Sequence, residues 1–150
     1  MAKFVGEHNA KLDDKGRLIF PQSFASLLQN EDSKPLRLVI KHDLFANCLS
    51  IYTYEEWEKE SENIKSKLNF FNPEHNEFWR GYMSNRALVE PDEKLRRFTI
   101  PKKMLEKIKV RKEVVFCGCD FKIELWAKEV YETNIPNDEK FSLLATKILG

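Results

Sequence analysis

One stretch of this sequence occurs twice, eighty residues apart. When Arg17 is placed over Arg97, "RLIFPQSFASLL" aligns with "RFTIPKKMLEKI". Each copy has the pattern of a short β-strand, a proline and an amphipathic helix. Pro21 and Pro101 stand where these helices begin, and proline fits there because the first helical turn leaves its N–H groups unpaired. The chain is therefore predicted to be a tandem duplication.

The sequence that follows each helix repeats as well. Apolar runs at 36–40 and 48–54 predict strand, loop and strand in the first copy. Runs at 113–116 and 122–126 predict the same arrangement in the second copy. A unit of roughly 45 residues is too small to bury a core alone. We therefore expect both copies to build one α+β, β-rich body.

Helical patterns separate and follow the copies. Thr53 and Glu56 form a capping box at the start of one helix, and Asn72 with Pro73 begins the next. A terminal helix is expected through Phe141, Leu144 and Ile148. The predicted organisation is a first repeat at 7–54, a helical connector at 55–82, a second repeat at 83–126, and a C-terminal helical tail at 127–150.

Composition restricts the class of protein. The formal net charge is only +1 although 33% of residues are charged, so any basic surface must be local. Three cysteines, Cys48, Cys117 and Cys119, do not suggest a disulfide framework. The sequence shows no signal peptide and no apolar run near the ~18 residues of a membrane span. A reduced cytoplasmic protein with no membrane contact is expected.

Enzyme chemistry finds no support in the motifs. Pairing His8 with Asp13 or Asp14, or Cys117 with His42, matches no nucleophile–base signature of known spacing. "CGC" with a distant histidine is not a zinc pattern, and the five glycines form no phosphate-binding loop. We expect no catalytic residue, no metal ligand, no cofactor and no small-molecule substrate.

A charged turn precedes the first aligned strand, in "LDDKGRLIFP" at 12–21. Asp13 and Asp14 are turn residues, because a carboxylate there accepts backbone N–H bonds, and Gly16 supplies the bend. Arg17 has two readings. Exposed arginines are usually only solvated, but a guanidinium on a rigid hairpin can fork onto a phosphate or a guanine edge.

The second turn, in "DEKLRRFTIP" at 92–101, is altered. Without a gap, Glu93 aligns with Asp13 and Arg96 aligns with Gly16. Alternatively, Asp92 is the counterpart of Asp13, with one residue inserted before Arg96. Both alignments remain open from the sequence. Arginine adopts the positive φ of a glycine only at a cost, so the second turn is predicted to have a different backbone.

The second copy also carries a local basic run. Between residues 94 and 112 only Glu106 opposes nine cations: Lys94, Arg96, Arg97, Lys102, Lys103, Lys107, Lys109, Arg111 and Lys112. Such runs are usually one solvated helix face. We predict that the turn residues among them contact nucleic acid, and we leave the helical lysines undecided between the two readings.

Four segments together resemble the MraZ family of bacterial transcriptional regulators, which are built from two SpoVT-AbrB repeats. They are "FVGEHNAKLDDKGRLIFP", "FNPEHNEFWRGYMS", "LSIYTYEEW" and "IELWAKEVY", and the resemblance runs from about Phe4 to Tyr131. The family implies a tandem AbrB-type swapped-hairpin β-barrel with flanking helices. The second turn departs from the family, which usually keeps an acid, a glycine and an arginine there.

The resemblance also implies a function. Members bind double-stranded DNA sequence-specifically at direct repeats upstream of their own gene, as ring-shaped homo-oligomers at the nucleoid. We expect repression of the division and cell-wall gene cluster. The alternative is an oligomeric scaffold without DNA binding, or an antitoxin-like interaction module. The DNA contacts implied are Lys11, Lys15, Arg17, Lys94, Arg96 and Arg97.

Overall fold

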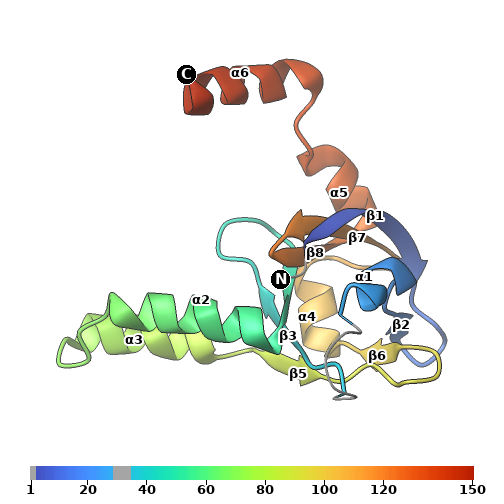
Figure 1. Ribbon diagram of the computed structural model, residues 1–150, viewed down its shortest axis with the longest axis horizontal. Coiled ribbons are helices and arrows are strands. Elements are labelled where there is room, and N and C mark those ends of the chain that lie inside the picture. The colour runs from blue at the N-terminus through green and yellow to red at the C-terminus, as the bar shows by residue number, and fades with distance from the viewer. Residues whose placement is uncertain (1–2, 29–34) are drawn as a thin grey trace.

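The computed structural model describes residues 3–28 and 35–150; residues 29–34 of the first predicted repeat lie outside the described residues. The fold is α+β, with a six-stranded sheet, a two-stranded ribbon and helices around them (Figure 1). The strands are β1 Phe4–Lys11, β2 Arg17–Ile19, β3 Leu38–His42, β4 Leu49–Thr53, β5 Ala87–Val89, β6 Arg97–Thr99, β7 Glu113–Asp120 and β8 Lys122–Ala127.

Helices occupy both predicted helical regions and follow both prolines. They are α1 Gln22–Ser26, α2 Tyr54–Ser66, α3 Pro73–Met83, α4 Lys102–Lys107, α5 Lys128–Asn134 and α6 Asp138–Leu149. Phe24 on α1 and Met104 and Leu105 on α4 are buried, as the helical stripes predict. Leu27, which follows the last residue of α1, is half exposed. Among the helices described, none is long and apolar enough to cross a membrane.

The two copies exchange strands in the six-stranded sheet. Its order is β1-β7-β8-β4-β3-β5, and the described pairings are antiparallel. β1 pairs with β7 along its whole length, while β5, its counterpart in the second copy, pairs with β3. Each copy therefore completes its part of the sheet with the first strand of the other. Ser50 on β4 lies opposite Glu124 on β8 at the centre.

The ribbon formed by β2 and β6 shows the duplication most directly. Leu18 lies opposite Phe98, Arg17 opposite Thr99, and Ile19 opposite Arg97. Exchanging each residue for its counterpart eighty positions away leaves the Leu18–Phe98 pair unchanged and interchanges the other two pairs. The ribbon is therefore symmetric about the Leu18–Phe98 pair, as a tandem duplication predicts.

The predicted closed barrel is wrong. The sheet is open and ends at β1 on one side and at β5 on the other. The strands that follow the charged turns, β2 and β6, pair with each other in the separate ribbon and do not close the sheet. Between the ribbon and the sheet, the rings of Phe20, Phe98 and Phe116 pack with centroids 6.3–6.4 Å apart in the main core.

The helices α2 and α3 form an arm that extends from the body (Figure 1). Both predicted caps are present: the Glu56 N–H donates to Thr53 Oγ1 at 3.2 Å, and the Glu74 N–H donates to Asn72 Oδ1 at 2.9 Å. Capping fixes where each helix of the arm begins, because it satisfies an N–H that the helix itself leaves unpaired.

A buried polar cluster joins the arm to the sheet. Lys41 on β3 is 2% exposed, and its Nζ lies 3.1 Å from Glu60 Oε2 on α2. Tyr52 donates to Glu60 Oε1 at 2.7 Å, and Tyr82 on α3 donates to Oε2 at 2.6 Å. Lys41 Nζ also lies 5.4 and 5.1 Å from the centres of these two rings. One carboxylate thus connects both helices of the arm with two strands.

The predicted terminal helix is confirmed as α6, which begins at an Asn137 cap. It follows α5 after residues 135–137 and stands away from the rest of the chain (Figure 1). None of its side chains is buried.

Gly118 is the point of closest approach between β1 and β7. A Cβ there would lie 2.6 Å from the carbonyl carbon of Phe4 and from the backbone nitrogen of Val5. Backbone cannot yield as a flexible side chain does, so we expect Gly118→Ala to lower the free energy of unfolding by about 1–3 kcal/mol. Gly81→Ala is the matched control, because no atom lies within 4 Å of its Cβ position. It should be neutral or stabilising in urea titrations, and an unchanged midpoint for Gly118→Ala would contradict the expected clash.

Candidate nucleic-acid interface

The first charged turn is organised by one carboxylate. Asp13 Oδ1 accepts the N–H groups of Lys15 and Arg17 at 2.9 and 2.8 Å, and Oδ2 accepts Arg17 Nε at 2.8 Å. The hydrogen bond from the Arg17 backbone is the main reason that the pKa of Asp13 lies below its ordinary value. Gly16 has a φ of 75°, so it supplies a left-handed residue at the bend. Asp14 is exposed.

The second turn has the same plan with one more residue. Asp92 Oδ1 accepts the Leu95 N–H at 2.7 Å, and Oδ2 accepts Arg97 Nε at 3.0 Å. The Leu95 bond is the main reason that the pKa of Asp92 is lowered. The Asp92 N–H bonds the Arg97 carbonyl, just as the Asp13 N–H bonds that of Arg17. Asp92, and not Glu93, is therefore the counterpart of Asp13.

Arg96 takes the place of Gly16 and adopts a φ of 58°. The second turn does have a different backbone, as predicted, because it is one residue longer, but Arg96 keeps the left-handed conformation of Gly16 despite its cost. A left-handed conformation costs a non-glycine residue about 1–2 kcal/mol. Hydrogen bonds offset the cost, because Arg96 Nε donates to the Phe20 carbonyl at 3.0 Å and the Phe20 N–H donates back to the Arg96 carbonyl at 2.8 Å. These bonds tie the second turn to the first copy.

Arg17 and Arg97, the first residues of β2 and β6, lie on the same side of the ribbon. Leu18 and Phe98 are buried, so the alternate residues Arg17 and Arg97 face outward together with Ile19 and Thr99. Arg17 and Arg97 are diagonal neighbours, which places their Cα atoms roughly 7–8 Å apart. Each guanidinium is held through Nε, and no hydrogen bond to its Nη atoms is found in the described part of the chain.

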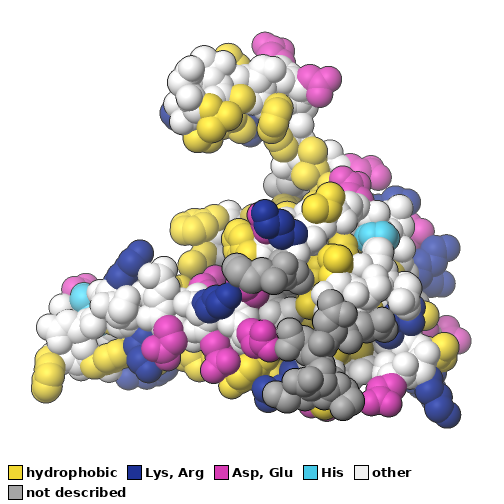
Figure 2. Space-filling model, in the orientation of Figure 1, with side chains coloured by type: hydrophobic (Ala, Val, Ile, Leu, Met, Phe, Trp, Pro, Cys, Tyr) yellow, Lys and Arg dark blue, Asp and Glu magenta, His cyan; other side chains and the backbone are white. Residues whose placement is uncertain are grey.

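The predicted lysines are exposed: Lys11 at the end of β1, and Lys15 and Lys94 in the turns before β2 and β6. Lys11 Nζ lies 3.8 Å from Glu113. Figure 2 shows Lys and Arg side chains standing out at the right-hand edge, over the corner that carries the ribbon, with acidic side chains among them. Of the helical lysines, Lys102, Lys103 and Lys107 on α4 are also exposed.

Sequence reasoning missed two parts of this region. Ile19 and Thr99 complete the outward side, and the strict alternation around the two buried residues of the ribbon was the signal for them. A groove of about 470 Å³ also lies between β1 and α1, next to Arg96. There His8 Nε2 lies 2.9 Å from Ser23 Oγ, and the His8 ring meets Phe24 edge-on. His8 therefore packs α1 onto β1 and does not pair with Asp13 or Asp14, the carboxylates that a catalytic pair would require.

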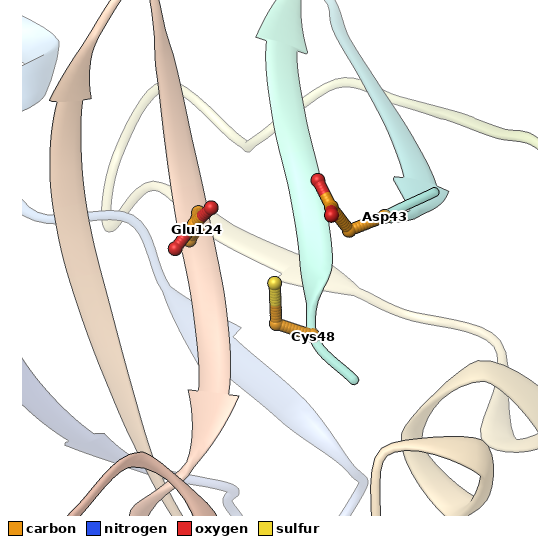
Figure 3. A group of neighbouring side chains, drawn as sticks. All are labelled: Asp43, Cys48 and Glu124. Carbon is orange, nitrogen blue, oxygen red and sulfur yellow. The ribbon is translucent and has the colours of Figure 1, made fainter. Parts of the chain in front are cut away.

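A second cluster of polar side chains lies where the central strands β4 and β8 meet the loop after β3. Ligand atoms of Asp43, Cys48 and Glu124 lie within 4.8 Å of one another (Figure 3). Lys122 Nζ lies 3.0 Å from Asp43 Oδ1 and 3.2 Å from Glu124 Oε2, so an ammonium already neutralises these carboxylates. Burial alone would raise the pKa of Asp43, but hydrogen bonds from Phe45, Lys122 and Ser50 lower it to about 2.

The thiols near this cluster are not poised to react. Burial raises the pKa of Cys48, and burial likewise raises the pKa of Cys119 to about 12. Metal binding requires a deprotonated thiolate. The cluster is therefore best described as an ion-pair network between β4, β8 and the loop after β3.

Comparisons with known proteins agree on one family. A family model described as "MraZ protein, putative antitoxin-like" matches residues 3–81 and again residues 83–147. A protein of Bacteroides thetaiotaomicron called transcriptional regulator MraZ is 34% identical over 150 residues, covering all of this chain and 94% of its own. Namesakes from Christiangramia forsetii and Dictyoglomus thermophilum are 31% and 39% identical, covering 100% and 86% of this chain and 95% and 82% of their own. By its sequence along nearly its whole length, this chain belongs to the MraZ family.

Proposed function

We propose that this protein is a sequence-specific DNA-binding regulator of transcription. The observation that carries the proposal is the ribbon, on which Arg17 and Arg97 face outward side by side, one from each copy. The major groove of B-DNA, about 12 Å wide, admits a two-stranded ribbon. Two arginines roughly 7–8 Å apart on such a ribbon reach base edges about two base-pair steps apart.

The two aspartates prepare these arginines for base reading. Asp13 and Asp92 hold the guanidinium groups through Nε, which leaves the two Nη groups of each arginine available to donate to DNA. Parallel N–H donors match the O6 and N7 acceptors of guanine. Holding the side chain in advance lowers the entropy lost when the contact forms.

The remaining cations serve the phosphates. Lys11, Lys15 and Lys94 are exposed around the ribbon and bring positive charge without a fixed fork. Arg96 contacts phosphate only, because it precedes β6 and lines the groove next to β1 and α1, away from the outward side of the ribbon. The second turn therefore adds a phosphate contact at the position where the first turn has Gly16, which carries no side chain.

The names of the relatives, all transcriptional regulators, support this reading. We further propose an AbrB-type exchange of first strands, action at the nucleoid in the cytoplasm, and repression of the division and cell-wall gene cluster through direct repeats upstream of this protein's own gene. Assembly into a ring would raise affinity by ~10²–10⁴ over one weak site, because linked subunits meet linked repeats.

Footprinting on the DNA upstream of the protein's own gene tests the proposal. We expect protected direct repeats at a constant spacing. Binding to that DNA should weaken linearly on a plot of log K against log salt concentration, since phosphate contacts release counterions. Lys94→Ala should make the slope shallower by about one per site, with little change in sequence preference.

A scrambled duplex of the same length is the control. Equal affinity for both duplexes would overturn sequence-specific recognition and leave the scaffold or antitoxin-like module as the reading that remains.

A further inference from the structure

A groove of about 520 Å³ lies between α3 and the loop that joins β3 to β4. One side of α3 lines it with residues at helical spacing, Glu74, Glu77, Phe78 and Gly81. Leu44 lines the groove from the loop, and both Leu44 and Phe78 are about half exposed. The groove is thus apolar at its centre and acidic at the end where α3 begins.

Nothing in the described residues explains why position 81 is a glycine. It lies inside α3, where glycine is the least favourable residue after proline. Its φ is not positive, and no atom lies within 4 Å of its Cβ position. A glycine on an open helix face permits close approach of another backbone. This groove therefore has the shape of a helix-binding site that the described chain does not fill.

The helix α6 has the complementary shape. Phe141, Leu144 and Ile148 form an i, i+3, i+7 stripe, and all three are exposed. Figure 2 shows apolar side chains gathered along the side of α6 that faces the rest of the molecule, with open space beneath them. Because none of the side chains of α6 is buried, the stripe has no partner in the described chain.

The charges of the groove and of α6 determine the direction in which the helix would lie in the groove. The groove carries Glu74 and Glu77 near the start of α3, and Arg86 and Lys107 at its other end. In α6, Asp138 stands at the start and Lys147 near the end, both beside the stripe. In an antiparallel arrangement, Asp138 lies near Arg86 and Lys107, and Lys147 lies near Glu74 and Glu77. The two helix dipoles then also run in opposite directions.

We propose that α6 of one copy docks antiparallel in the α3 groove of a second copy. The inference rests on the proposed function, because it names the surfaces that would join subunits of the DNA-binding ring. α6 and α3 lie well apart in Figure 1, and α6 is joined to α5 by only residues 135–137, which span about 11 Å at most. Each copy offers one helix and one groove, so the contact repeats head to tail.

Two complementary variants of the full chain test the docking. Leu144→Asp places a charge in the stripe, and Gly81→Arg places a large side chain in the groove at a position whose Cβ meets no atom within 4 Å. Leu143→Asp, next to the stripe in sequence but outside it and more exposed than Leu144, is the matched control. By light scattering without DNA, the wild type and this control should be oligomers, and the two variants should be monomers.

An equimolar mixture of Leu144→Asp and Gly81→Arg gives the decisive result. The intact α6 of one variant fits the intact groove of the other, so we expect heterodimers and nothing larger. A monomeric wild type, or variants that keep the wild-type mass while their circular dichroism stays native, would overturn the docking. Neither outcome tests the proposed role of the ribbon in DNA recognition, because DNA preference is measured separately on the arginine variants.

Discussion

Replacing Arg17 and Arg97 together by alanine is expected to abolish the preference for repeat-containing DNA. Each fork to a guanine contributes about 1–3 kcal/mol of discrimination, so each single replacement should weaken specific binding about 5- to 150-fold. The effect should fall on specific binding far more than on scrambled DNA. Fluorescence anisotropy on both duplexes at several salt concentrations measures the two affinities and the salt slope.

Two further variants separate base reading from simple charge. Arg17→Lys keeps the cation but loses the planar fork, so it should keep the salt slope and lose sequence preference. Arg80→Ala removes an exposed arginine of α3, which lies on the arm away from the ribbon (Figure 1), and should change neither affinity. If the double alanine variant still prefers the repeats, the ribbon is not the reading surface.

Glu60→Ala is expected to have the largest effect on stability. It removes the only carboxylate that pairs with Lys41 in the described residues, and leaves an ammonium that is 2% exposed without its counter-ion. Breaking a buried ion pair in this way costs about 3–5 kcal/mol. Tyr52 and Tyr82 lose their hydrogen-bond acceptor as well. Urea unfolding followed by tryptophan fluorescence would measure the loss.

Replacing both partners is the matched control. Lys41→Met with Glu60→Gln removes the buried charge on each side, so it should recover most of the loss. Burial alone would raise the pKa of Glu60, but hydrogen bonds from Tyr82 and Tyr52 and the Lys41 charge hold it below its ordinary value. The wild type should therefore lose this stabilisation as the pH falls below that value, and the double variant should not. A loss below about 1 kcal/mol for Glu60→Ala would show that the cluster does not anchor the arm.

Local patterns in the sequence predicted much of the fold. The offset of eighty predicted the duplication, and the structure adds that Leu18 pairs with Phe98, because a duplicated strand can pair with its own copy about a symmetry axis. The capped helices of the arm and the terminal helix follow equally local signals. The boundaries proposed for the two repeats stay predictions.

Contacts between distant residues were beyond the sequence. Nothing local indicates that β1 pairs with β7 more than a hundred residues later, or that Arg96 would reach the Phe20 carbonyl. The choice between Asp92 and Glu93 also required the fold, since both spacings suit a turn. Lys41 was the one visible signal of the buried cluster, a cation inside the apolar run "LVIKH".

The exchange of first strands has a consequence for biosynthesis. β1 leaves the ribosome about a hundred residues before its partner β7 is complete. Contact order is therefore high, and the entropy cost of closing so long a loop precedes the stabilisation that the contacts provide. The nascent first copy therefore keeps an unpaired strand edge until β7 has been synthesised.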